Sequence, residues 1–191
     1  MPEREPDPKV KTFLGKLALL DAGSKAKLKR DAGKTIGESH SIGLFYRLLP
    51  YGLNAAQEES YFLIATLFPM AEIGVAGNLG ASLRHARDPK NNKGLDRRIE
   101  ILLDADNTQL PFRLRQAIQF LKSRRVSVNW QRLLEDLQKW NRPSRIVQKQ
   151  WARDYFALPA ETPPNGPELY EVDDDQREDN KLIIEKENKL C

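Results

Sequence analysis

The pattern that decides the fold class lies in residues 94–125, GLDRRIEILLDADNTQLPFRLRQAIQFLKSRR. Apolar side chains recur every three or four residues on both sides of Asn107 and Thr108, and this spacing places them on one face of an α-helix. They are Leu95, Ile99, Leu102 and Leu103 before the break, and Leu110, Leu114, Ile118 and Leu121 after it. Arginine and lysine fill the positions between them. The stretch therefore predicts two amphipathic helices, each with a buried apolar face and a basic solvent face.

The same spacing recurs in most of the chain before residue 159 and predicts an all-α bundle of about eight helices. Side chains that can cap a helix precede several of the segments: Ser24, Asn54, Asn78 and Asn129. The other expected helices cover residues 10–20, 24–33, 44–49, 55–71, 78–87, 129–140 and 143–158. Trp130 and Trp151 fit apolar stripes and are predicted to be core residues, whereas Trp140 falls off its stripe and is assigned to neither core nor surface.

Length and composition allow one good core or two small ones in 191 residues, of which 40% are apolar. No apolar run approaches the length of a membrane span, and the charged N-terminus lacks the apolar region of a signal peptide. The single cysteine, Cys191, excludes a disulfide framework within the chain. These features predict a cytoplasmic protein.

The net charge of +4 is unevenly distributed. Residues 1–160 carry a balance of +10, while residues 161–191 contain ten acids and four bases. We therefore divide the chain into a charged leader (1–9), a helical domain (10–158) and an acidic tail (159–191), with a possible boundary between two lobes near 88–94. The tail is rich in proline and acids and is predicted to be largely disordered. A basic body favours a polyanionic partner, because clustered cations release counterions from phosphates.

Residues suited to catalysis or metal binding are sparse. His40 and His85 stand in no metal-binding spacing, so no metal or other cofactor is expected. Glu100, Asp104 and Asp106 superficially resemble the carboxylates of a metal-dependent nuclease, but exposed ion pairs with neighbouring Arg97 and Arg98 are a simpler role for them. The sequence predicts a protein that is not an enzyme, and the nuclease hypothesis ranks last.

Four segments, taken together, resemble a known family. They are LFYRLLPYG (44–52), LGASLRHAR (79–87), LDRRIEILLDAD (95–106) and LRQAIQFLKSRRVSVNWQRLLEDLQKWNRPSRIVQKQWARDYF (114–156). In order and spacing they are similar to the small subunit of the type I-E CRISPR surveillance complex Cascade, the CasB family. The resemblance covers residues 13–156 and has no counterpart for the acidic tail.

The resemblance implies a non-catalytic, all-helical subunit, two copies of which line up head to tail in the complex. Its partners would be the backbone subunits that carry the guide RNA and the large subunit. Basic faces would support the target strand and the displaced strand of the R-loop, without sequence preference. Opening a DNA duplex against a guide RNA is nearly balanced in free energy, so backbone contacts can decide whether the open state persists.

The predicted phosphate-contacting residues are lysines and arginines from every part of the helical domain. The resemblance carries Arg30, Arg47, Arg98, Arg115 and Arg142, while Arg142, Arg145, Lys149 and Arg153 are spaced to form a continuous stripe on the last helix. The whole set is Lys25, Lys27, Lys29, Arg30, Arg47, Arg84, Arg98, Arg115, Arg142, Arg145 and Lys149. A protein adaptor whose basic faces meet acidic protein surfaces, without touching DNA, remains the alternative.

Overall fold

The computed structural model describes residues 7–74, 77–88 and 90–156. Within these ranges the chain forms nine α-helices and two short 3-10 helices, and its one β-type contact is an isolated bridge between Ile73 and Val128. The predicted all-α class is confirmed. The helices are α1 (Pro8–Ala18), α2 (Ala22–Arg30), η1 (Ile36–Glu38), α3 (Ile42–Leu48), α4 (Ala55–Leu67), η2 (Phe68–Met70), α5 (Leu79–His85), α6 (Lys93–Leu103), α7 (Leu110–Ser123), α8 (Trp130–Leu137) and α9 (Ile146–Phe156).

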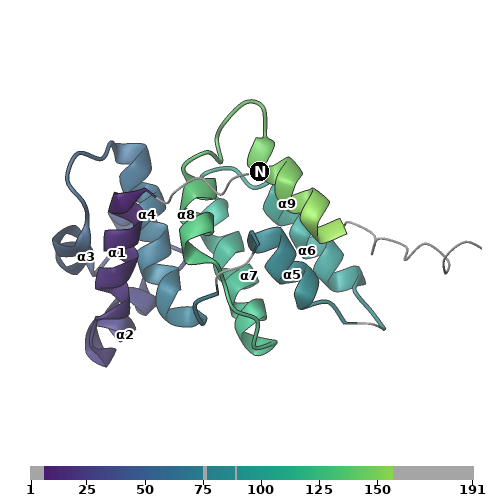
Figure 1. The fold of residues 1–191 in the computed structure, drawn as a ribbon, viewed down its shortest axis with the longest axis horizontal. Coiled ribbons are helices and arrows are strands. Elements are labelled where there is room, and N and C mark those ends of the chain that lie inside the picture. Colours follow the sequence, from purple (N-terminus) through teal and green to yellow (C-terminus); the bar gives the residue numbers. More distant parts are fainter. Residues whose placement is uncertain (1–6, 75–76, 89, 157–191) are drawn as a thin grey trace, which may run out of the picture. The chain divides into compact units, whose positions relative to one another are not determined.

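The helices pack in an order that differs from their order in the chain (Figure 1). Helices α1 to α4 lie together, α7 and α8 follow beside them, and α5, α6 and α9 form the other side of the described unit. Helix α4 contacts α2, α7 and α8, which explains why its last seven residues, Tyr61 to Leu67, are all buried. A helix that is apolar all round is stable only when neighbours cover every face.

One continuous apolar cluster holds the described helices together. At its α1–α4 side the rings of Phe13 and Tyr61 stand 4.8 Å apart, edge to face. Across the molecule, Trp130 and Trp151 are each 1% exposed, which confirms both as core residues. Each large aromatic side chain removed from water contributes roughly 1.5–3 kcal/mol or more.

Three of the four predicted caps precede a helix start. Asn54 and Gln57 form a capping box before α4, and Asn78 and Asn129 cap α5 and α8. Helix α2 is the exception. It begins at Ala22 because the Asp21 carboxylate, rather than Ser24, accepts the first-turn bond, from the Ser24 backbone N–H at 2.9 Å. The Asp21 carboxylate also accepts a hydrogen bond from the Ser24 hydroxyl at 2.7 Å. Ser24, the predicted cap, therefore donates to Asp21, which is the residue that caps the helix.

Trp140, which the sequence left unassigned, belongs to the core. It is 3% exposed, and its ring lies 5.0 Å from that of Trp151. Its indole N–H donates to the Ala105 carbonyl oxygen at 3.0 Å, so the polar edge of the ring is also satisfied. The helical stripe missed Trp140 because it lies in the turn after α8 ends, where helical spacing no longer applies.

The polar segment 88–94 joins α5 to α6, and both of these helices contact α9. The division into two lobes near this segment stays a prediction, as do the boundaries of the leader and the domain. The acidic tail, 159–191, lies outside the described residues. None of the described helices combines the length and apolar composition needed to cross a membrane.

Candidate nucleic-acid interface

Four of the predicted residues are exposed at the C-terminal half of α2 and on α7, and we call Lys27, Lys29, Arg30 and Arg115 the α2–α7 basic cluster. Lys27 and Arg30 are one turn apart on α2, and all four side chains are exposed. The turn after α2 is held to α7 at Gly33, whose φ is +87°. A Cβ on Gly33 would lie 3.0 Å from Cδ of Arg115, so the stem of Arg115 lies directly on this glycine.

The charges of this cluster are not neutralised by carboxylates within the described part of the chain. No ion pair or side-chain hydrogen bond involves any of its four members there. Three of them sit at the C-terminal half of α2, where the helix dipole favours cations and gives them a purely structural benefit of less than about 1 kcal/mol. Arg115 has no such benefit, because it stands in the first half of α7. The dipole therefore does not explain the cluster as a whole.

Lys25 precedes the cluster in sequence but has a different role. Its ammonium donates to the Ala18 carbonyl oxygen at 2.8 Å, at the end of α1. This bond satisfies one of the carbonyl groups that a helix leaves unpaired at its C-terminus. Lys25 is thus engaged in fixing the α1–α2 corner.

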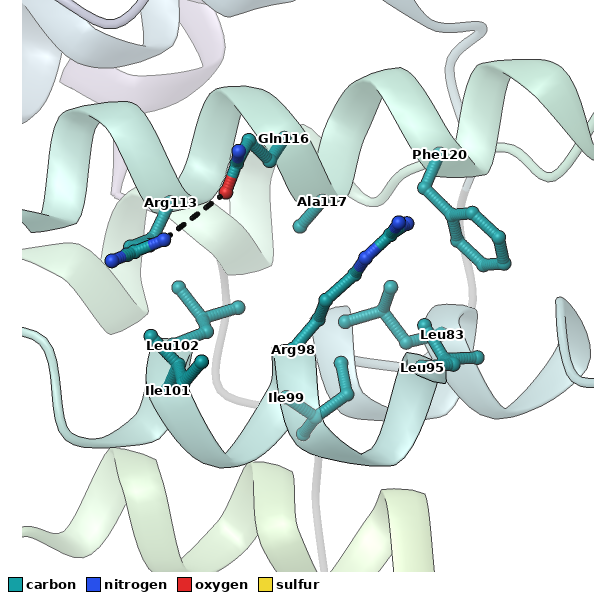
Figure 2. Close-up of a pocket in the computed structure, with 10 residues that line it drawn as sticks. All are labelled: Leu83, Leu95, Arg98, Ile99, Ile101, Leu102, Arg113, Gln116, Ala117 and Phe120. Carbon is teal, nitrogen blue, oxygen red and sulfur yellow. Dashed lines mark hydrogen bonds between the residues drawn. The ribbon is translucent and has the colours of Figure 1, made fainter. Parts of the chain in front are cut away.

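A second basic region lies between α6 and α7 (Figure 2). Arg98 of α6 and Arg113 of α7 border a groove with an apolar floor, which we call the α6–α7 groove. Arg98 is exposed and makes no ion pair within the described residues. The groove is lined by Leu83, Leu95, Arg98, Ile99, Ile101, Leu102, Arg113, Gln116, Ala117 and Phe120.

The third predicted region, around the start of α9, is arranged differently from the prediction. Residues 141–145 form a turn, and α9 begins at Ile146 instead of Pro143. Arg145 has a φ of +50°, a left-handed conformation that ends any helical path through it. Its guanidinium donates to the Leu103 carbonyl oxygen at 2.8 Å and to the Asp104 carboxylate at 2.7 Å. The continuous stripe is therefore wrong.

Arg142 and Lys149 stay exposed on either side of that turn, and neither has an ion-pair partner in the described residues. Arg47 and Arg84 stand on other helices. The Arg47 side chain donates to the Gly43 carbonyl oxygen at 3.2 Å within α3, and Arg84 is half-buried in the last turn of α5. The structure thus places the predicted residues on several different helices, and these four do not belong to the α2–α7 basic cluster.

The acidic candidates do not assemble into a site. Asp104 pairs with Arg145, a partner 41 positions along the chain, instead of the predicted neighbours Arg97 and Arg98. Asp106 caps the turn before α7: hydrogen bonds from Thr108 and from the Gln109 backbone hold the pKa of its carboxyl below the ordinary value. Among the described residues, no group of three or more His, Cys, Asp or Glu side chains is placed to hold a metal ion.

Two residues of α7, one that lines the groove and its neighbour in the chain, were absent from the predicted set. Arg113 was read only as part of the general basic face, and Phe112 was not singled out, although its side chain is 48% exposed. Their adjacency in the sequence, an aromatic residue followed by an arginine off the apolar stripe, was the available signal.

Comparisons with known proteins agree with this geometry. Residues 24–156 match the family model of the CRISPR-associated protein Cse2, which is more than half of the chain. The chain belongs to the Cse2 family. The matched range includes all eleven predicted phosphate-contacting residues, but a family match alone assigns none of them a role. It confirms the predicted family.

Individual members of the Cse2 family show how far the likeness extends. The CRISPR-associated protein Cse2 of Thermus thermophilus is 30% identical over 128 residues, 62% of this chain and 73% of that protein. A crystal structure of CasB from Thermus thermophilus has a TM-score of 0.68 at 26% identity, covering 80% of this chain and 99% of that one. A chain of a CRISPR RNA-guided surveillance complex shares the fold, with a TM-score of 0.66 at 19% identity over 77% of this chain and 91% of that one.

Proposed function

We propose that this Cse2-family protein is a non-catalytic small subunit of a type I-E CRISPR surveillance complex. It binds nucleic-acid backbones without sequence preference and so stabilises the R-loop and the assembly. The observation that carries this proposal is the α2–α7 basic cluster, in which four cations from two helices are exposed and have no carboxylate partners within the described residues. The shared fold with a chain of a surveillance complex supports it.

The chemistry of the cluster suits phosphates more than bases. Its members are long, flexible side chains ending in point charges or guanidinium forks, and these bind phosphate oxygens wherever the backbone passes. Their affinity comes from releasing counterions condensed on the nucleic acid. Such contacts hold a strand in place and read no sequence, which is what a subunit stabilising any R-loop requires.

Within this proposal the partners are the subunits that carry the guide RNA, the large subunit, the target and displaced strands, and a second copy of the chain placed head to tail. The setting is the cytoplasm. No step of the proposed role needs a cofactor.

The test uses the full complex assembled with variants of this chain. Replacing Arg30 and Arg115 with glutamate should weaken binding of target DNA, because it puts repulsion where phosphates pass. The dependence of log affinity on log salt should also become shallower, by about one unit per lost contact. A matched control replaces Lys11 and Lys16 with glutamate. Both are exposed on α1, outside the proposed surface, and the change in net charge is the same.

If the Arg30 and Arg115 variant keeps both the affinity and the salt slope of the unmodified complex, the DNA-contact proposal is wrong. The alternative, a structural adaptor with basic faces, predicts a different result. The variant subunit would then be lost from the complex in size-exclusion chromatography even when no DNA is present.

A further inference from the structure

The α6–α7 groove combines charge with aromatic surface, a property that the α2–α7 basic cluster lacks. In Figure 2, Arg98 extends from α6 toward α7 between Ala117 and Phe120, and Arg113 lies at the other end of the groove beside Gln116. Between the two guanidinium groups the lining is apolar, with Leu95, Ile99 and Leu102 among its residues.

Helix α7 presents two phenylalanines, and each has an arginine against its ring. The Arg113 guanidinium lies 5.5 Å from the ring centre of Phe112, and that of Arg124 lies 5.6 Å from the ring centre of Phe120. The two phenylalanines are eight residues apart on α7, so they are separated by about 12 Å along the helix axis. Proteins that bind single strands combine aromatic rings, on which bases stack, with cations that contact the backbone.

Arg113, which lines the groove, and Arg124, further along α7, make few and long polar contacts among the described residues. Nε of Arg113 is buried and has no hydrogen-bond acceptor among the described residues. Its Nη1 is held only by Gln116 Oε1, at 3.5 Å, the long limit for such a bond. Arg124 meets Asp88 at 3.8 Å, a distance that indicates a loose, solvent-screened pair.

Phe112 lies between Arg113, which lines the groove, and the turn that follows α2. A Cβ on Gly33 would lie 3.7 Å from Cα of Phe112, in addition to its contact with Arg115. Phe112 and Arg115 therefore border the same turn after α2. A strand whose phosphates follow Arg30 and Arg115 would bring its next bases to Phe112, which is 48% exposed.

We propose that Phe112 and the α6–α7 groove form a base-stacking subsite for single-stranded nucleic acid. Arg98 and Arg113 would hold phosphates, while the rings of Phe112 and Phe120 contact base faces. The inference rests on the proposed function, since it assumes that nucleic acid reaches this side of the molecule, and it adds that the strand is unpaired. Bases of a duplex stack on one another and offer no free face to a protein side chain.

The experiment compares three fluorescein-labelled probes of equal length with the full chain: a thymidine oligonucleotide, an abasic oligonucleotide and a DNA duplex. Phe112→Ala should weaken binding of the thymidine strand roughly 5- to 100-fold, as expected for one lost stacking contact. Binding of the abasic strand and the duplex should stay within about twofold, because backbone contacts are unchanged. Phe112→Leu should resemble Phe112→Ala, since leucine is apolar but has no flat ring.

Tyr51→Ala is the matched control: Tyr51 is a 98% exposed aromatic residue between α3 and α4, away from the groove, and its replacement should affect none of the probes. An equal loss for all three probes, or no loss for the thymidine strand, would overturn the stacking subsite. A different result would refute the proposed function itself. In that case, replacing both Arg30 and Arg115 with glutamate would leave the binding of all three probes unchanged.

Discussion

The carboxylate of Asp31 shows how much one buried side chain can organise. Its Oδ2 accepts the backbone N–H groups of His40 and Ser41 at 2.9 Å and the Ser41 hydroxyl at 2.6 Å, and its Oδ1 accepts the Lys34 ammonium at 3.0 Å. Burial works to raise the pKa of this carboxyl, but the hydrogen bonds from Ser41, Lys34 and Ser39 outweigh it and hold the pKa far below the ordinary value of 3.8. The whole connection from α2 to α3 is folded around this one anion.

Replacing Asp31 with asparagine should therefore destabilise the protein at neutral pH by about 2–3 kcal/mol. A neutral amide oxygen accepts these hydrogen bonds less strongly than a carboxylate, and the amide NH₂ group would face N–H and O–H donors with which it cannot bond. A carboxyl whose pKa is lowered by folding stabilises the folded protein at pH values above the pKa of the unfolded chain. That contribution to the free energy of unfolding is lost as the pH falls toward the pKa of the folded protein. Urea unfolding should show the difference between wild type and variant at pH 7 and a smaller difference below about pH 4.

Asp136 supplies the matched control, because its pKa is shifted the other way. Burial raises the pKa of this carboxyl above the ordinary value, although the indole N–H of Trp151 donates to it at 2.7 Å and Arg132 lies 3.1 Å away. Asparagine keeps an acceptor for Trp151 and removes a poorly solvated charge, so Asp136→Asn should cost less than about 1 kcal/mol. Equal losses for the two variants would contradict this account of both sites.

At the scale of the elements, helix α5 packs unusually closely on α9. A Cβ added to Gly80 would overlap the backbone carbonyl oxygen of Trp151, so the two helices touch backbone to backbone at this point. The same pair of helices is joined at the N-terminus of α5, where the Asn78 amide donates to the Asp154 carboxylate at 2.5 Å. The absence of a side chain at Gly80 thus allows α9 to pack this closely on α5. Because Trp151 of α9 donates a hydrogen bond to Asp136, Gly80 also affects the surroundings of Asp136.

Gly80→Ala should destabilise the protein by roughly 1–3 kcal/mol or more, because the overlapping atom is backbone and cannot rotate away. Gly15→Ala is the control, since Gly15 stands inside α1 and nothing lies within 4 Å of its added Cβ. That variant should stabilise the protein by up to about 1 kcal/mol, the gain in helix propensity. Thermal unfolding followed by circular dichroism measures both, and a tolerated Gly80→Ala would show that α5 and α9 can separate at little cost.

At the scale of the whole molecule, the arginines that pair with carboxylates of the fold differ from those that we propose to bind nucleic acid. Arg87, Arg132 and Arg145 meet carboxylates of the fold at distances from 2.7 to 3.8 Å. The α2–α7 basic cluster and Arg98 have no such partner among the described residues. The first group supports the arrangement of the helices, and the second contains the side chains that we propose contact phosphates.

A polyanion that binds the folded chain must raise its unfolding temperature by mass action. We expect single-stranded DNA to raise the midpoint of thermal unfolding by several degrees at low salt, and the shift to vanish at high salt because counterion release weakens. The variant carrying glutamate at Arg30 and Arg115 should show a smaller shift than the variant carrying glutamate at Lys11 and Lys16. A shift that is independent of salt, or equal in the two variants, would argue against the basic cluster as the binding surface.

The sequence by itself determined the helical class, the order of the helices with most of their starts to within about two residues, and the family. These depend on interactions within a few residues, such as the apolar period of residues 94–125 and the Asn54–Gln57 capping box. It also drew attention to the lysines and arginines of α2 and to Arg98 and Arg115, because their types and spacing are local properties.

Only the tertiary structure decided which of these cations stand together and which are engaged. Arg145 is paired with Asp104, Trp140 is buried against Ala105, and Gly33 receives the stem of Arg115. In each case the partners are at least 35 positions apart in the chain, so no local period encodes them. Helix packing creates these contacts, because it alone fixes which faces of distant segments meet.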